Sequence, residues 1–250
     1  MSGRQIIPTG MNKITTVVFD LDGTLLDSLQ DLACSVNHAL TEHGMPTRSE
    51  TEIRLMLGNG VRRLVGQAVP QGTHEDITEQ VLATFRVHYA KHCHDLTHPF
   101  DGIMDMLAEL HRCGYRMAIV SNKPASAVQE LNAQFFSGYM NIAVGESTTV
   151  RRKPNPDGVL EAIRRMGATP SEAVYVGDSE VDFVTAQNAG IPCITVLWGY
   201  RDDTFLRNTR ATLFARRPSE LPQLLEHISS NRYHPLPKTN TPLPLMRAPF

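Results

Sequence analysis

Two aspartates at the end of an apolar segment have the residue type and spacing for nucleophilic or acid–base chemistry. Residues 16–19 are β-branched and aromatic, which predicts a buried strand. Asp20 and Asp22 follow it, and their two-residue spacing directs both carboxylates to the same side. Gly23 then allows the backbone to turn. Because ligands bind at the carboxyl ends of parallel strands, the pair predicts a catalytic site. The alternative is that the two aspartates only belong to an acidic loop that follows the strand and have no catalytic function.

Further polar side chains lie close to the ends of later apolar segments. Ser121 follows residues 115–120 and offers either a hydroxyl for a phosphate oxygen or a helix cap. Lys153 precedes a helix that begins with proline and offers either a fixed cation or a solvated charge. Asp178 follows another apolar segment, and Asp182 comes a helical turn later, so both can add carboxylates to the site. Alternatively, Asp178 only caps a helix and Asp182 is a surface charge. A parallel sheet brings all these positions to one edge.

The segments that position these residues alternate between strand and helix. Helical periodicity separates the predicted strands, which lie at 16–19, 115–120, 141–144, 173–176, 193–197 and 211–215. Such a series implies a parallel sheet with right-handed crossovers. We therefore predict the α/β class, with a doubly wound, Rossmann-like parallel sheet.

A long helical stretch interrupts this alternation after the first strand. Its apolar residues recur at helical spacing in four segments, around 29–40, 49–57, 61–69 and 73–89. Both ends of the stretch flank the edge that carries Asp20 and Asp22, so the insert can cover the carboxylates and exclude water. We expect an N-terminal extension (1–13), a core (14–25 and 99–228), an all-helical cap (26–98) and a flexible, proline-rich tail (229–250).

Composition excludes several classes of function. The 250 residues are 41% hydrophobic and carry a formal net charge of −2, without a basic block for nucleic acid or an anionic membrane. No apolar run approaches the roughly 20 residues of a membrane span, and the first ten residues lack the apolar core of a signal peptide. The four cysteines are scattered, which favours reduced thiols. We expect a cytoplasmic protein.

One histidine-rich stretch has the composition of a metal site. It contains His88, His92, Cys93, His94 and His98, and the first two are spaced to share a helix face. The stretch also closes the last predicted helix of the insert, where histidine interacts favourably with the helix dipole. We give this second interpretation the greater weight.

In order and spacing, the polar positions resemble the four motifs of the haloacid dehalogenase superfamily of phosphatases. The motifs are Asp20-x-Asp22-Gly-Thr, Ser121, Lys153 and Gly177-Asp178-x-x-x-Asp182, and the resemblance covers roughly residues 14 to 228. Within the superfamily the chain is most similar to the phosphoglycolate phosphatases, through residues 21–28, 57–65, 121–124, 153–156 and 198–200. Ser121 stands where many relatives have threonine, and it keeps the hydroxyl.

The resemblance implies a role for each motif. Asp20 would be the nucleophile that forms an aspartyl-phosphate, and Asp22 the general acid and base. A phosphate dianion repels a carboxylate, so cations must offset the charge. Mg²⁺ would be held by Asp20, Asp178 and the backbone carbonyl of Asp22. Asp182 would orient Lys153 or a metal-bound water without contacting the ion. The residues assigned to the phosphate are Thr24, Ser121, Asn122 and Lys153.

The substrate is expected to be a small phosphorylated metabolite, with 2-phosphoglycolate the best match. We expect Gly58, Asn59 and Gly60, together with Arg62 or Arg63, to select it, because an arginine can pair with a carboxylate; the alternative is that both arginines only solubilise their helix. A phosphomutase of the β-phosphoglucomutase type stays open. So do a phosphatase of sugar phosphates, nucleotides or pyrophosphate, and a binding protein without activity. The sequence does not indicate the oligomeric state.

Overall fold

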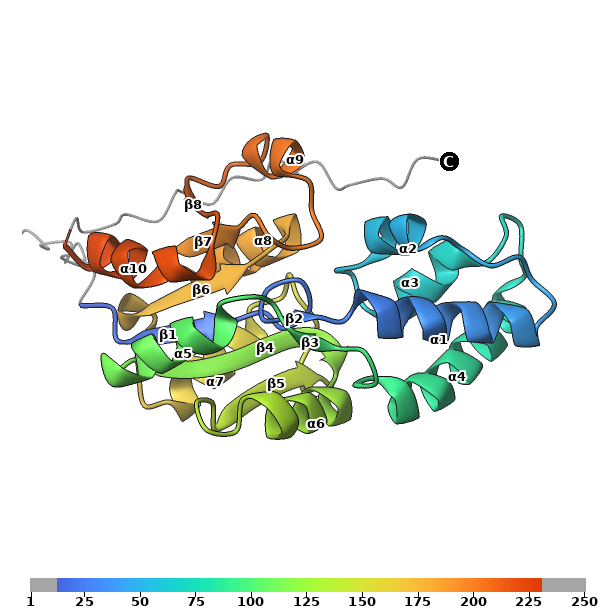
Figure 1. Cartoon of the computed structure of the whole chain (residues 1–250), viewed down its shortest axis with the longest axis horizontal. Helices are drawn as coiled ribbons and strands as arrows, with labels where there is room; N and C mark the ends of the chain where they lie inside the picture. The colour runs from blue at the N-terminus through green and yellow to red at the C-terminus, as the bar shows by residue number, and fades with distance from the viewer. Residues whose placement is uncertain (1–12, 231–250) are drawn as a thin grey trace, which may run out of the picture.

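The computed structural model describes residues 13–230, and its centre is a parallel sheet of six strands (Figure 1). The strands are β1 (Thr16–Phe19), β4 (Arg116–Pro124), β5 (Ile142–Glu146), β6 (Ala173–Gly177), β7 (Cys193–Val196) and β8 (Leu213–Ala215). Their spatial order is β5-β4-β1-β6-β7-β8, so the chain proceeds outwards from β1 on both sides. The reversal beside β1 is where open α/β sheets bind ligands. The predicted fold class is confirmed.

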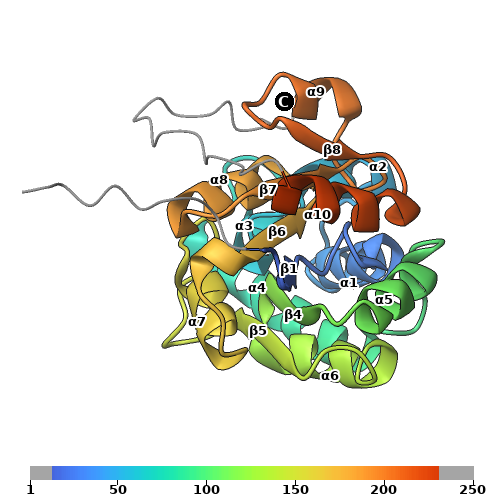
Figure 2. The same cartoon turned by 90° about the vertical axis from the view of Figure 1, so that its left-hand side faces the viewer.

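Two layers of helices cover the sheet (Figure 2). Val17 and Phe19 share one core with residues of α5 (Ile103–Arg112), α6 (Ala125–Phe135) and α10 (Leu221–Ser230). Val18 points to the opposite core, formed with α7 (Asp157–Arg165) and α8 (Glu180–Ala189). Alternate side chains of β1 are therefore buried on both faces, which explains why its sequence is continuously apolar. A short helix, α9 (Asp203–Arg207), lies between β7 and β8.

The insert is an all-helical cap with its own hydrophobic core. Its helices are α1 (Leu29–Glu42), α2 (Glu50–Met56), α3 (Val61–Ala68) and α4 (Glu75–His92), and they lie beyond the carboxyl end of the sheet in Figure 1. Ser49 and Glu52 form a capping box at the start of α2. Two short antiparallel strands, β2 (Leu26–Asp27) and β3 (His98–Pro99), connect the cap to the core. The predicted boundaries at 26 and 98 fall in this pair, and the division itself stays a prediction.

The predicted terminal segments mostly lie outside the described residues. α10 extends to Ser230, so residues 229 and 230 are helical, and their assignment to a flexible tail is wrong. Ser229 Oγ accepts a hydrogen bond from the backbone N–H of Ile14 at 3.2 Å, which holds this helix against the start of β1. Between residues 13 and 230, no helix combines the length and apolarity needed to span a membrane.

Candidate active site

The loop after β1 is fitted closely to the loops that follow β6 and β7. The backbone N–H of Asp20 continues the sheet by donating to the carbonyl of Val176 at 2.9 Å. Gly23 has φ +80°, and a Cβ on it would lie 2.4 Å from Asp178 Oδ2. Glycine is therefore required both for the turn and for the approach of Asp178. This fit places the motifs after β1 and β6 next to each other.

Lys153 is a buried cation shared by two carboxylates. Its Nζ lies 2.7 Å from Asp20 Oδ1 and 2.7 Å from Asp182 Oδ1, and it donates to the Tyr175 hydroxyl at 3.0 Å. Asn122 holds the backbone of this lysine: its Oδ1 accepts from the Lys153 N–H at 2.6 Å, and its Nδ2 donates to the Lys153 carbonyl at 3.2 Å. The lysine is thus fixed at both ends, with its charge against the predicted nucleophile.

Three buried carboxylates gather around that lysine. Oxygens of Asp20, Asp178 and Asp182 all lie within 4.8 Å of one another. Burial and the charge of Asp182 raise the pKa of Asp20 well above its usual value, and they raise that of Asp178 to about 7. Asp182 is held by Ser179, whose backbone N–H and Oγ donate to Oδ2 at 3.1 and 2.6 Å. One lysine does not balance this much negative charge, so the cluster favours a bound cation.

The cluster meets the chemical requirements of a magnesium site. All its donors are oxygens, which Mg²⁺ prefers, and only part of them would be needed because this ion keeps several waters. Asp20 and Asp178 agree with the predicted ligand set. The third carboxylate of the cluster belongs to Asp182. The side chain of Asp22 also lines the cavity but is bound by Lys123, and the predicted role of its backbone carbonyl as a ligand stays a prediction.

Asp22 connects the site to the cap through a lysine. Its Oδ1 accepts hydrogen bonds from Ser28 Oγ and from Lys123 Nζ, the latter at 2.7 Å. Lys123 Nζ also donates to the hydroxyl of Tyr89 on α4. Burial disfavours the charge of this lysine, but Asp22 and Tyr89 together outweigh that cost and raise the pKa of Lys123. Tyr89 of the cap is therefore connected to Asp22, the predicted general acid and base, through Lys123.

Arg201 is a second buried cation between core and cap. Its side chain is 2% exposed, its Nε donates to Glu180 Oε2 at 2.9 Å, and its Nη2 donates to the Leu57 carbonyl at 2.7 Å. Gly58 has φ +98°, and a Cβ on it would lie 2.9 Å from Arg201 Nη2. The glycine therefore allows the cap loop to close over the arginine.

A cavity separates the sheet edge from the cap. The core lines it with Asp20, Asp22, Ser121, Asn122, Lys123, Lys153, Asp178, Ser179, Tyr200 and Arg201, and the cap with Leu32, Leu57, Gly58, Gly60, Val61 and Leu64. Most of the predicted polar residues thus meet in one place. The apolar cap side chains would shield the carboxylates from bulk water.

Other predicted residues lie away from this cavity. Arg62 forms an ion pair with Glu79 at 2.6 Å, and Arg63 lines a separate hollow beside α2 and α3. The carbonyl of Asn59 accepts from an exposed arginine, Arg152. The Thr24 side chain is fully buried, and its Oγ1 has no hydrogen-bond partner among the described residues. The structure does not place these four side chains against the carboxylate cluster.

Sequence reasoning gave no role to several polar residues of the site. Lys123 lies inside the Ser121–Pro124 segment, Glu180 inside the motif that begins at Gly177, and Arg201 directly after Trp198–Tyr200. Lys123 lies in the polar end of β4, and Glu180 and Arg201 follow β6 and β7, so the available signal was their position near the carboxyl ends of central strands. Their partners Leu57 and Tyr89 belong to the cap, which no local pattern connects to these strands.

Comparison with known proteins identifies the class of protein. The family model of haloacid dehalogenase-like hydrolases matches residues 17–196, which include all four motifs. The chain belongs to the haloacid dehalogenase-like hydrolases. Within this family it is a phosphatase, that is, a phosphoric monoester hydrolase.

The relatives agree in sequence and in structure. A phosphoglycolate phosphatase of Pseudomonas putida is 37% identical over 207 residues, 80% of this chain and 75% of that protein. One from Vibrio parahaemolyticus is 34% identical over 83% of this chain and 94% of its own. A crystal structure from Lactobacillus delbrueckii subsp. bulgaricus, provisionally described as a phosphoglycolate phosphatase, is 33% identical with a TM-score of 0.81, over 85% of this chain and 98% of that one.

Proposed function

We propose that this chain is a Mg²⁺-dependent phosphatase that hydrolyses a small phosphorylated metabolite, 2-phosphoglycolate first, through an aspartyl-phosphate on Asp20. One observation carries the proposal: the Asp20 carboxylate faces a cavity under the cap, with the Lys153 ammonium 2.7 Å from Oδ1 and two further buried carboxylates beside it. This arrangement combines a nucleophile, a fixed cation and a set of oxygen donors at one point.

Asp20 is oriented for attack on phosphorus. The backbone N–H of Leu21 donates to Oδ1 at 2.7 Å, and Lys153 contacts the same oxygen. Bound Mg²⁺, held by Asp20 and Asp178 with Asp182 beside them, would offset the charges of the nucleophile and the phosphoryl oxygens. Asp182 keeps Lys153 in place from behind, because its Oδ1 contacts Nζ. Lys153 and the Ser121 hydroxyl bind the transferring oxygens.

Asp22 carries the proton in both halves of the reaction. Its carboxyl group protonates the departing alkoxide and then takes a proton from the water that hydrolyses the aspartyl-phosphate. Ser28 and Lys123 hold its Oδ1, so the side chain keeps one orientation through both steps. Asn122 holds the backbone of Lys153, which supports a positioning role instead of direct phosphate binding. Thr24 is buried and does not line the cavity, so its assignment to the phosphate gains no support.

The substrate assignment rests on the relatives and on the cations of the cavity. Proteins named phosphoglycolate phosphatase align with most of this chain. A carboxylate beside the phosphate needs a cationic partner, and Arg201 lines the cavity at the edge closed by the cap loop. We propose Arg201 for this role in place of Arg62 or Arg63, because an arginine pairs well with a carboxylate.

The four free cysteines support a cytoplasmic location.

A substrate panel tests the proposal. The protein is incubated with Mg²⁺ and, in turn, 2-phosphoglycolate, β-glucose 1-phosphate, a nucleoside monophosphate and pyrophosphate, and released phosphate is measured. We expect release without any bisphosphate activator, with the highest kcat/KM for 2-phosphoglycolate. Isomerisation of the sugar phosphate without phosphate release would identify a phosphomutase. No turnover of any compound would restore the interpretation as a binding protein.

A further inference from the structure

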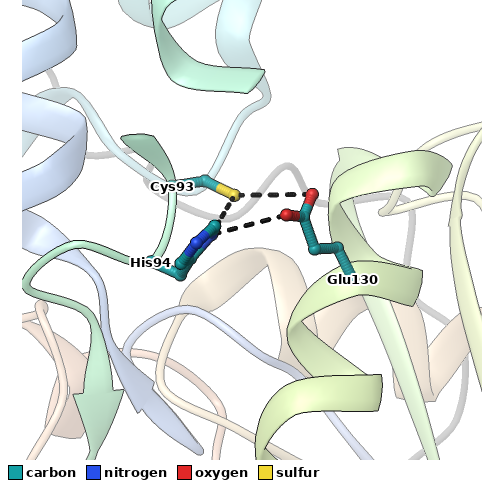
Figure 3. A group of neighbouring side chains, drawn as sticks. All are labelled: Cys93, His94 and Glu130. Atoms are coloured by element: carbon teal, nitrogen blue, oxygen red, sulfur yellow. Dashed lines mark hydrogen bonds and ion pairs between the residues drawn. The ribbon is translucent and has the colours of Figure 1, made fainter. Parts of the chain in front are cut away.

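A cysteine, a histidine and a glutamate meet where the cap rejoins the core, outside the catalytic cavity. Cys93 caps the C-terminus of α4, His94 follows it, and Glu130 projects from the core helix α6 (Figure 3). Cys93 Sγ lies 3.7 Å from His94 Nδ1 and 4.0 Å from Glu130 Oε2, and His94 Nδ1 lies 3.4 Å from Glu130 Oε1. The thiol is buried, whereas the imidazole and the carboxylate are partly exposed.

We propose that Cys93, His94 and Glu130 form a site for a zinc-like divalent cation that ties the cap to the core. Sulfur, imidazole and carboxylate donors together suit Zn²⁺ and do not suit Mg²⁺. In a tetrahedral zinc site, ligand distances of about 2.0–2.3 Å separate neighbouring donor atoms by roughly 3.3–3.6 Å. With one donor atom taken from each residue, the three donors lie within 4.8 Å of one another, and the Cys93 Sγ–His94 Nδ1 separation is 3.7 Å. Rotation of the half-exposed Glu130 side chain would bring one of its oxygens closer to both partners, with water as the fourth ligand.

The other histidines of the same stretch are occupied elsewhere. His88 Nδ1 contacts Ser35 Oγ at 3.0 Å, and its ring stacks between those of His38 and His92. His92 Nδ1 lies 2.7 Å from Asp95 Oδ2. His98 Nδ1 lies 2.9 Å from the carbonyl of Leu96. Only Cys93 and His94 of this stretch are directed toward Glu130, so the ligand set differs from the five-residue cluster visible in the sequence.

Metal binding at this site releases one proton. Burial and the nearby Glu130 carboxylate raise the pKa of the Cys93 thiol, so without a cation it is protonated at neutral pH. On binding, the S–H bond breaks, the proton passes to solvent, and the sulfur electron pair forms the bond to the metal. The charge of the cation then also compensates the Glu130 carboxylate, which otherwise faces only the His94 imidazole and the Cys93 thiol within the group.

A cation here would act on the position of the cap. Tyr89 lies one turn before Cys93 on α4, and its hydroxyl contacts Lys123, which holds Asp22. Fixing the end of α4 to α6 therefore holds the cap in the arrangement that supports Asp22. This consequence rests on the proposed function, whereas the metal site itself does not.

Cobalt is a spectroscopic probe for the site, because a thiolate ligand to Co²⁺ produces a near-ultraviolet charge-transfer band that carboxylates do not produce. Co²⁺ is titrated into the full chain in the presence of saturating Mg²⁺, which fills the carboxylate cluster. We expect one equivalent to bind with such a band, and Zn²⁺ to displace it. Cys93→Ser should abolish the band, and Glu130→Gln should weaken binding by about tenfold or more, as even indirect metal contacts do.

Two variants serve as matched controls. Cys113 Sγ lies 3.7 Å from Glu109 Oε1, but among the described residues no third donor completes a metal-binding group with them, so Cys113→Ser should leave the band unchanged. Asp178→Asn should also leave it unchanged, which separates this site from the catalytic one. Glu130 is about half exposed, so its variant folds even where the buried Cys93 variant does not. No band in the wild type, a band that survives Cys93→Ser, or unchanged affinity in Glu130→Gln would overturn the proposal.

Discussion

Arg201 and Lys153 show two different uses of a buried cation in one site. Lys153 faces the nucleophile directly, with its ammonium group between Asp20 and Asp182. Arg201 is neutralised by Glu180 and also binds the carbonyl of Leu57 in the cap loop. Both charges survive burial because each has an acidic partner within hydrogen-bond distance. Under the proposed function, Lys153 would contact the phosphoryl group and Arg201 the carboxylate of the substrate.

Arg201→Lys should reduce the selectivity for a substrate with a carboxylate. Lysine keeps the charge but loses the fork of donors, so we expect KM for 2-phosphoglycolate to rise about tenfold, in line with the loss of one charged hydrogen bond. For a phosphate ester without a carboxylate, KM should change much less. Arg62→Ala is the control and should alter neither value, because Arg62 pairs with Glu79. Equal rises for both substrates would remove Arg201 from this role.

Tyr89→Phe tests the contact between the cap and Lys123. The variant removes the hydroxyl that accepts from the buried ammonium group. We expect the free energy of unfolding to fall by about 1.5–3 kcal/mol, the range for hydrogen bonds to charged groups. Urea denaturation measures it. An unchanged midpoint would mean that this hydroxyl does not stabilise Lys123.

Among the secondary-structure elements, the loops after β1, β6 and β7 depend on glycines that allow them to touch. A Cβ on Gly199 would lie 2.3 Å from Asp178 Cβ and 2.3 Å from the carbonyl oxygen of Gly23. Neither neighbour is the free end of a flexible side chain, so the loops cannot yield without moving the carboxylate cluster. Tight packing of these loops thus sets the geometry of the site.

Gly199→Ala should therefore destabilise the protein and disturb the site together. We expect a loss of about 1–3 kcal/mol, the usual range for overpacking, and a large fall in phosphatase activity. Gly138→Ala is the matched control, because a Cβ there meets nothing within 4 Å. Comparable stability of the two variants in urea would show that the loops are looser than their contacts indicate.

The sequence predicted where β1 and β6 end, but β4 runs to Pro124, four residues beyond the predicted end, and the contacts with the cap were not predictable. Apolar segments that end in Asp20, Ser121 and Asp178 have strong local signals, and parallel topology brings those ends together. The position of Arg62 depends on the packing of α3 against α4, where Glu79 lies within reach. That packing is decided by tertiary contacts. The sequence analysis assigned substrate selection to Arg62 or Arg63, whereas the arginine that lines the cavity is Arg201.

For the molecule as a whole, the carboxylate cluster connects stability to pH and to metal. The pKa of Asp178 is about 7 in the folded protein against 3.8 ordinarily. The folded state therefore keeps a proton that the unfolded state releases, and the resulting stability is full below about pH 4 and lost as the pH rises through 7. A cation bound to the cluster would replace that proton.

Thermal unfolding in EDTA should show this dependence. We expect Tm of the wild type to be higher at pH 5.5 than at pH 8, and added Mg²⁺ to raise it at pH 8. Asp178→Asn removes the charge, so its Tm should exceed that of the wild type at pH 8 in EDTA and respond less to Mg²⁺. A wild-type Tm that rises from pH 5.5 to pH 8 in EDTA would contradict the assignment.

Trapping of the phosphorylated protein tests the role of Asp20 most directly. The enzyme is mixed with Mg²⁺ and radiolabelled 2-phosphoglycolate, quenched with acid within one turnover, and digested for peptide mapping. An acyl phosphate is cleaved by hydroxylamine, so the label should be hydroxylamine-sensitive, lie on the peptide that contains Asp20, and be absent from Asp20→Asn. Turnover without any labelled protein, or a label on another residue, would contradict nucleophilic attack by Asp20.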